Sequence, residues 1–201
     1  MTNPYIQRKA LTAFREGLLL NGYNRVLISG WTRVQVDSVW LAAHIGFPNT
    51  GIRCDRLAAI DIDCDTPGVT PTVSAVVQRI LGPTPCVRVR GSRVILLYAT
   101  DEDAEGSAST PRFRDDAQRT NRVEVLRGRR RQFIAAGLHP SGEPYQWPDK
   151  SPMDVPRDLL PRVTADEVRL ALDAATEELA KFEGLEQLEA DPDGASYQVE
   201  Q

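Results

Sequence analysis

The stretch LAAIDIDCD, residues 57–65, decides the fold of this chain of 201 residues. Successive side chains of a β-strand point to opposite faces of its sheet. One face of this stretch therefore carries the apolar side chains at positions 60, 62 and 64. The other face carries Asp61, Asp63 and Asp65. The pattern predicts a strand with one face in the core and one acidic face.

The acidic face suggests a site for divalent metal ions. Carboxylates two residues apart on one strand face are about 7 Å apart, and their mutual repulsion weakens the strand unless a cation lies between them. Mg²⁺ and Mn²⁺ bind carboxylate oxygens, and two such ions together can catalyse nucleotidyl transfer. Two alternatives stay open at Asp61 and Asp63: an edge strand with solvated acids, and the acid pair of a glycosyltransferase or nuclease.

A third acid lies in the sequence RVEVL, residues 122–126. The apolar neighbours of Glu124 predict a strand whose polar face carries this carboxylate. If the two strands are neighbours, three acids share one surface and complete a site for two metal ions. An ordinary surface glutamate would give the same local pattern.

The rest of the chain predicts alternating helices and short strands. Helical spacing favours helices at residues 4–20, 37–45 and 70–81, and Thr164 with Glu167 forms a capping box that starts a helix reaching about Glu189. Short strands are expected at residues 25–29, 51–53, 57–63, 121–126 and 132–136, with turns near Asp55 and across residues 127–131. Residues 86–90 and 93–99 form a hairpin around Gly91 and Ser92. The polar segment 100–120 is expected to be a mobile loop, and residues 137–147 a structured one.

Composition restricts the class of protein. Apolar residues make up 41% of the chain, enough for a core in one large domain. No run of roughly 18 apolar residues occurs, so no membrane span is expected, and the cytoplasm is the default location. The three cysteines form no C-x-x-C pair, which argues against a structural zinc site or a disulfide framework.

Positive charge is concentrated in arginine clusters, although the net charge is −4. Arginine binds phosphate through two parallel hydrogen bonds, so such clusters suit nucleic acid or nucleotides. A GC-rich genome produces the same arginine bias without a functional cause. The clusters are Arg88, Arg90 and Arg93; Arg112, Arg114, Arg119 and Arg122; and Arg127, Arg129, Arg130 and Arg131.

An ordered set of short motifs resembles a known family. The motifs are NTGI (residues 49–52), LAAIDID (57–63), TPCVRV (84–89), ILLY (95–98), VEVL (123–126) and GLHPSGEPYQW (137–147). Together they resemble the prim-pol domain of phage and plasmid replication proteins, in the archaeo-eukaryotic primase superfamily. The last motif is the most specific, and the resemblance covers roughly residues 1–165.

The resemblance implies an α+β fold of the archaeo-eukaryotic primase type. Its core is a mixed or antiparallel sheet related to the RNA-recognition fold and flanked by helices. Residues 1–163 would form the catalytic domain, residues 164–190 a C-terminal accessory helix, and residues 191–201 a disordered tail. By the same resemblance, Asp61, Asp63 and Glu124 are the catalytic ligands of two Mg²⁺ or Mn²⁺ ions.

The chain departs from the superfamily at its second motif. A histidine that contacts the phosphates of the incoming nucleotide is usual there, but none occurs around residues 90–94. A phage subgroup has a basic residue instead, which makes Arg93 the candidate, supported by Arg88 and Arg90. His139 is a further candidate for nucleotide contact, or alternatively orders its own loop. Tyr145 and Trp147 are candidates for base stacking, although packing beneath the loop accounts for them too.

The resulting functional prediction is a template-dependent DNA primase and polymerase of phage or plasmid replication. Its expected partners are single-stranded template, primer and nucleoside triphosphates, with a replicative helicase as a further candidate. The basic segment Arg127, Arg129, Arg130 and Arg131 would contact template phosphates, or is simply solvated. Two other functions stay open: a non-catalytic module that binds single-stranded or origin DNA, and a metal-dependent nuclease.

Overall fold

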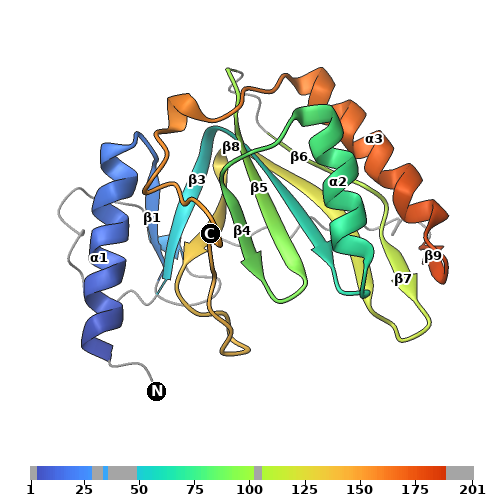
Figure 1. Ribbon diagram of the computed structural model, residues 1–201, viewed down its shortest axis with the longest axis horizontal. Helices are drawn as coiled ribbons and strands as arrows, with labels where there is room; N and C mark the ends of the chain where they lie inside the picture. Colours follow the sequence, from blue (N-terminus) through green and yellow to red (C-terminus); the bar gives the residue numbers. More distant parts are fainter. Residues whose placement is uncertain (1–3, 29–33, 36–48, 102–105, 189–201) are drawn as a thin grey trace.

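The computed structural model describes residues 4–28, 34–35, 49–101 and 106–188 (Figure 1). The helix expected at residues 37–45 and the tail at residues 191–201 lie outside these ranges. The helices are α1 (Pro4–Leu20), α2 (Val69–Leu81) and α3 (Ala165–Lys181), with a 3₁₀ turn at Arg157–Leu159. The strands are β1 (Arg25–Ile28), β2 (Val34–Gln35), β3 (Asn49–Cys64), β4 (Val87–Arg90), β5 (Arg93–Ala99), β6 (Gly106–Ser109), β7 (Phe113–Asp115), β8 (Thr120–Ala136) and β9 (Leu185–Gln187).

The described strands form one sheet, and every pair of named strands is antiparallel. The long strand β3 is central. It pairs with β8 along one edge, while β1 and β5 pair with successive parts of its other edge. The predicted hairpin is confirmed as β4 and β5. The chain is therefore an α+β protein, and of the two predicted sheet types the antiparallel one is correct.

The two longest strands are continuous, which corrects the prediction of four shorter strands joined by turns. Arg53 pairs with Gln132, Cys54 with Gly128, and Ala58 with Arg127, so each strand carries extra residues at the same place. Such irregularities bend a strand without ending it. Figure 1 shows β3 and β8 turning together at the crest of the sheet. The turn-like residues near position 55 and at 127–131 form this bend.

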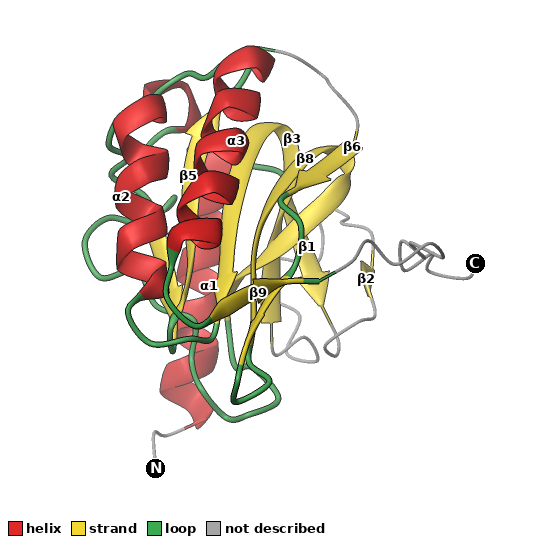
Figure 2. Ribbon diagram, turned by 90° about the vertical axis from the view of Figure 1, so that its right-hand side faces the viewer, coloured by secondary structure: helices red, strands yellow, loops and turns green. Residues whose placement is uncertain are grey.

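Helices α2 and α3 cover one face of the sheet (Figure 2). This face receives the apolar side chains predicted from the alternation in β3, including Ile60 and Ile62, and they share a core with Val125 of β8 and Leu179 of α3. The capping box of α3 is confirmed by the hydrogen bonds between Thr164 and Glu167. The helix ends at Lys181 rather than near residue 189, because the chain turns there into the short strand β9.

The opposite face has its own apolar core beside the acids. Ala59 of β3 and Leu97 of β5 are buried there with Leu18 of α1 and Leu160 of the connector before α3. Asp61 follows Ala59 on the same face, so the first acid lies at the margin of this core. The sheet thus holds the acids rigidly, with hydrophobic packing on both sides of β3.

The polar segment 100–120 was expected to be a mobile loop, and its described part corrects that prediction. Strand β6 pairs with β8 over Gly106–Ser109, and Phe113 of β7 is buried against the sheet. Backbone hydrogen bonds to an existing strand need no apolar run in the added strand, which is why composition alone missed them. Both short strands extend the sheet on the side of Glu124.

Candidate active site

Asp61 and Glu124 are directly opposite each other in the antiparallel register of β3 and β8. Opposed residues point to the same face, with Cβ atoms about 4.5–5.5 Å apart. Asp63 follows on that face, opposite Arg122. The structure therefore brings together all three acids that the sequence singles out, on the face away from α2 and α3.

Arginine side chains neutralise two of these acids. Nη1 of Arg93 lies 2.6 Å from Oδ1 of Asp63, and its Nε and Nη2 donate hydrogen bonds of 2.9 and 2.7 Å to Asp65. Arg122 donates from Nη2 to Oε2 of Glu124 at 3.1 Å. Arg93, predicted to contact a triphosphate, therefore lies at the acids and bridges Asp63 and Asp65.

Burial and charge shift the pKa values of this group in opposite directions. Burial raises the pKa of Asp61 to about 6, and the negative charges of Asp63 and Glu124 push it the same way, against the opposing effect of Arg88. The hydrogen bonds from Arg93 hold the pKa of Asp65 below its usual value. The surroundings of Asp61 thus disfavour the charged form of this carboxyl.

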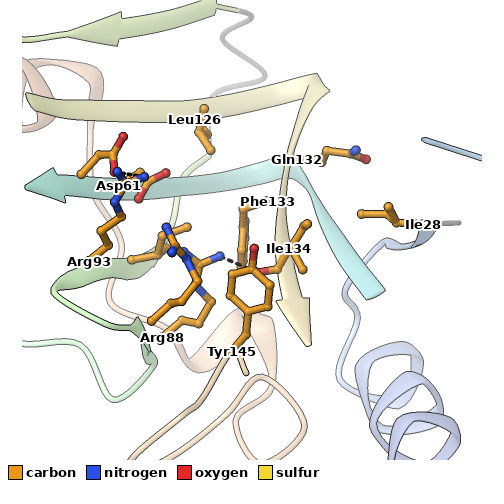
Figure 3. A pocket seen from close by; sticks show the side chains of 12 residues that line it. Ile28, Asp61, Arg88, Arg93, Leu126, Gln132, Phe133, Ile134 and Tyr145 are labelled. Carbon is orange, nitrogen blue, oxygen red and sulfur yellow. Dashed lines mark hydrogen bonds and ion pairs between the residues drawn. The ribbon is translucent and has the colours of Figure 1, made fainter. Parts of the chain in front are cut away.

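A pocket of about 320 Å³ opens beside the acids, at the inner side of the bend in the sheet (Figure 3). This volume is in the range of small-molecule sites. One end of the pocket is charged, with Asp61, Asp63 and Arg93. Away from these groups the lining is mainly apolar, with Phe133, Ile134 and Ile28, beside Gln132. The pocket therefore offers both charged and apolar surface to a ligand.

Arg88 and Arg90 reach the same pocket from β4. Arg88 is buried, donates to the backbone oxygen of Ile134, and lies 4.8 Å from the ring centre of Tyr145. Arg90 is 3.5 Å from a carboxylate oxygen of Glu143. The structure thus brings all three arginines of the predicted nucleotide site to one pocket.

His139 lies in the loop at residues 137–147, outside the lining of the pocket. Its Nδ1 is 2.8 Å from Oγ of Ser141, and its ring meets that of Tyr145 edge-on at 6.3 Å. Burial lowers the pKa of His139, and the positive charges of Arg90 and Arg93 add to this shift. These contacts order the loop, so a role of His139 in nucleotide binding stays a prediction.

The basic segment of β8 divides between two locations. Arg127 pairs with Ala58, whose side chain belongs to the helix-covered core. The side chain of Arg127 therefore lies on that face, away from Glu124. Arg129 and Arg130 are exposed at the bend, where Arg129 lies 3.4 Å from Asp55. None of the four arginines of this segment lines the pocket. The structure therefore does not bring this segment together as one surface at the acids.

Comparison with known protein families identifies the chain. Residues 24–162 match the model of the bifunctional DNA primase/polymerase N-terminal domain, Prim-Pol. The chain belongs to the Prim-Pol family. A search of curated proteins found no match. The matched range contains the acids, the arginines and the pocket.

Membership of the Prim-Pol family supports a function of the DNA primase/polymerase type, with DNA and nucleotides as substrates. It also implies dependence on a divalent metal. No described helix is long and apolar enough to cross a membrane. Within the ranges that the structure describes, no group of three or more His, Cys, Asp or Glu side chains is arranged to hold a metal ion.

The donor set of this Prim-Pol domain nevertheless fits a hard divalent ion. Three carboxylates share one face, and carboxylate oxygens are the preferred ligands of Mg²⁺ and Mn²⁺. Oδ1 of Asp63 is buried and has an ion-pair contact but no hydrogen bond among the described residues. Arg93 and Arg122 now supply the positive charge that an ion would bring.

Several residues of the site lack a strong signal in the sequence. Arg122 is two positions before Glu124, so strand alternation alone puts it beside the acids. Phe133 and Ile134 resemble ordinary core residues, and only the bend in β8 brings them to the pocket. Tyr145 had two interpretations, stacking and packing; it lines the pocket and stacks on Arg88.

Proposed function

We propose that this chain is a template-dependent DNA primase and polymerase that makes and extends primers by two-metal nucleotidyl transfer, on an archaeo-eukaryotic primase fold related to the RNA-recognition fold. The observation that carries the proposal is the pairing of Asp61 with Glu124 across β3 and β8, with Asp63 on the same face. Phage or plasmid replication in the host cytoplasm is the setting that the motif resemblance favours, with a replicative helicase as partner.

Asp61, Asp63 and Glu124 would hold the two Mg²⁺ or Mn²⁺ ions. When bound, such ions lower the pKa of an attacking hydroxyl and neutralise a leaving pyrophosphate. The chain itself keeps the three carboxylates on one rigid face, where the cores on both sides of β3 prevent them from separating. The raised pKa of Asp61 reflects an uncompensated charge that a cation would relieve.

Arginine side chains would bind the triphosphate of the incoming nucleotide. Arg93 now contacts Asp63 and Asp65, and its planar guanidinium suits phosphate oxygens equally well. We infer that Arg93 exchanges these carboxylates for the triphosphate as the metal ions bind. Arg90 adds charge beside it, while Arg88 is held deeper in the pocket. His139 is a further nucleotide contact in this proposal.

Primer extension tests the proposal directly. Purified protein is mixed with a labelled primer on a single-stranded template, deoxynucleoside triphosphates, and Mg²⁺ or Mn²⁺. We expect template-dependent extension by the wild type and none by Asp61→Asn, Asp63→Asn or Glu124→Gln. The matched control is Asp173→Asn on the exposed surface of α3, which should extend as well as the wild type.

Two other outcomes would replace the proposal. Cleavage of the labelled strand without added nucleotides would make the chain a nuclease that uses the same acids. A folded wild type that binds DNA but incorporates no nucleotide with either metal would make it a non-catalytic DNA-binding module. The ion pairs of Arg93 and Arg122 with the acids favour this second candidate, since they neutralise Asp63 and Glu124 without metal.

A further inference from the structure

Apart from Oδ1 of Asp63, which is ion-paired with Arg93, two buried polar groups of pocket-lining residues have no hydrogen-bond partner among the described residues: the hydroxyl of Tyr145 and Nε of Arg88. Both residues line the pocket, and they are 8% and 5% exposed. Leaving a buried donor or hydroxyl unpaired destabilises the protein. Such a pair, side by side in a cavity, indicates groups that a bound ligand is meant to satisfy.

The fold holds Tyr145 firmly in this position. Its backbone nitrogen donates to the oxygen of Gly137 at 3.1 Å, and the next residue, Gln146, exchanges two backbone hydrogen bonds with Val89 of β4. The guanidinium of Arg88 lies 4.8 Å from the tyrosine ring centre. Figure 3 shows the tyrosine reaching from its loop toward β3 and β8, hydroxyl end first, beside Arg88. The unpaired hydroxyl is therefore aimed into the pocket by a rigid support.

The side chains that line the pocket change from charged at one end to apolar at the other. Arg93 and the acids form the charged end, and Phe133 and Ile134 belong to the apolar end. Tyr145 and Arg88 each combine an apolar part with a polar end: the tyrosine has a ring and a hydroxyl, and the arginine has an aliphatic stem and a guanidinium. A nucleoside triphosphate with its phosphates at Arg93 and its base at Phe133 has its sugar between them. A sugar hydroxyl both donates and accepts, so one such group can satisfy the tyrosine hydroxyl and Nε of Arg88.

We propose that Tyr145 and Arg88 form the sugar subsite of the nucleotide pocket, in which the Tyr145 hydroxyl bonds a hydroxyl of the sugar and so determines which sugars are accepted. The proposal rests on the nucleotide site of the proposed function. A site with buried polar groups discriminates against an analogue that lacks the matching hydroxyl, because those groups then stay unpaired. Tyr145 would thereby set the preference of the enzyme among nucleotide sugars.

Equilibrium binding of three nucleotides tests the subsite. Binding of ATP, dATP and 2′,3′-dideoxy-ATP is measured by calorimetry with Ca²⁺, for the wild type and for Tyr145→Phe. We expect Tyr145→Phe to weaken binding about 5- to 50-fold for the nucleotides that carry the recognised hydroxyl. Binding of dideoxy-ATP should stay within about twofold of the wild type. A loss for ATP alone assigns the 2′-hydroxyl, and an equal loss for ATP and dATP assigns the 3′-hydroxyl.

A matched control separates this effect from a loss of structure. Tyr98 is also buried, but its hydroxyl donates to Gly82 at 2.8 Å on the other face of the sheet. Tyr98→Phe should lower the melting temperature and leave the binding of all three nucleotides unchanged. An effect of Tyr145→Phe that is equal for all three nucleotides, or absent for all three, overturns the sugar subsite.

The binding experiment and primer extension fail independently. Hydroxyl-dependent binding by a protein that extends no primer would support the subsite and refute the polymerase proposal. Extension by a protein whose binding shows no dependence on Tyr145 would refute the subsite alone. A wild type that binds none of the three nucleotides would overturn the subsite together with the nucleotide site beneath it.

Discussion

Glu124 of β8 lies directly across from Asp61 of β3, so two carboxylates that are remote in sequence are neighbours on the same face of the sheet. Like charges directly opposite each other destabilise a sheet. The two acids lie on a strand pair with a hydrophobic core on each side, and Arg122 forms an ion pair with Glu124. The arrangement costs stability, and the proposed metal site, in which the two acids would share a cation, accounts for it.

Glu124→Gln should abolish activity without unfolding the protein. Gln keeps the shape of Glu and can still accept from Arg122, but it removes the charge opposite Asp61. We expect the free energy of unfolding at pH 7 to stay the same or rise by up to about 1 kcal/mol, while primer extension falls by about a hundredfold or more. Urea denaturation and extension assays on one preparation measure both. A large loss of stability would mean that Glu124 has a structural role instead.

The pKa of Asp61 predicts how stability depends on pH. Its pKa rises from the ordinary value of 3.8 to about 6 in the folded protein, so the folded state binds the proton more tightly than the unfolded state. The charged form of Asp61 therefore destabilises the folded protein fully above pH 6, and this effect is absent below pH 4. Asp61→Asn should be more stable than the wild type at pH 7, by on the order of 2 kcal/mol.

The comparison of wild type with Asp61→Asn isolates this group. Other carboxyls have lowered pKa values, among them Asp65 and Asp154, and their contributions are lost as pH falls. They are present in both proteins and cancel in the difference. The difference in unfolding free energy should shrink as pH falls from 7 to 4. A difference that is constant with pH would contradict the raised pKa of Asp61.

Local pattern predicted most of the sheet and the identity of the acids. Alternation in β3 assigned Asp61 and Asp63 to one face, and the hairpin residues Gly91 and Ser92 located β4 and β5. The bend was missed because Asp55 and Gly128 are residue types that favour turns. In the structure, Arg56 and Gly128 adopt positive φ within continuous strands. A bulge and a turn share local chemistry, and only the pairing with the neighbouring strand distinguishes them.

The pocket itself could not be predicted, for the same reason. Phe133 comes to line the same pocket as Asp61 because β8 bends, and that bend depends on how β3 and β8 pair over their full lengths. Register between distant strands is a property of the whole sheet and leaves no local pattern. The unpaired hydroxyl of Tyr145 is likewise visible only once its surroundings are known. The sequence predicted which residue types form the site, whereas the shape of the pocket around them depends on the tertiary structure.

Arg93→Ala should tighten metal binding while weakening nucleotide binding. Arg93 is the positive group at Asp63, with a side chain about one-third exposed, so its removal frees the acid for a cation. We expect Mn²⁺ to bind about two- to fivefold more tightly, and dATP about 10- to 100-fold more weakly because charge-assisted hydrogen bonds are lost. Mn²⁺ titrations followed by electron paramagnetic resonance and calorimetry with dATP measure the two effects.

Arg90→Ala is the control for the metal effect. Arg90 contacts Glu143 in the loop at residues 137–147 and neither of the paired acids Asp63 and Asp65. Its removal should leave Mn²⁺ affinity unchanged while weakening dATP binding. Equal Mn²⁺ affinity in Arg93→Ala and the wild type would refute the exchange of Arg93 between carboxylates and triphosphate.

Within the basic segment of β8, we expect Arg129 and Arg130 to bind template and Arg127 not to bind it. Arg129 and Arg130 are exposed at the bend, whereas Arg127 points to the helix-covered side and has a buried Nε. Each phosphate of a single strand that a protein neutralises adds about 0.7 to the log–log slope of binding against salt. Arg129→Ala and Arg130→Ala should therefore each weaken binding of a single-stranded oligonucleotide and reduce that slope.

Arg127→Ala has a different expected outcome. Removing this partly buried side chain should lower the free energy of unfolding by about 1–2 kcal/mol because its packing is removed, and leave the salt slope of DNA binding unchanged. Fluorescence anisotropy at several salt concentrations, with thermal melting in parallel, distinguishes the two classes. If all three variants lowered the slope equally, the arginines would act as one phosphate-binding surface, and the division of this segment at the bend would have no functional meaning.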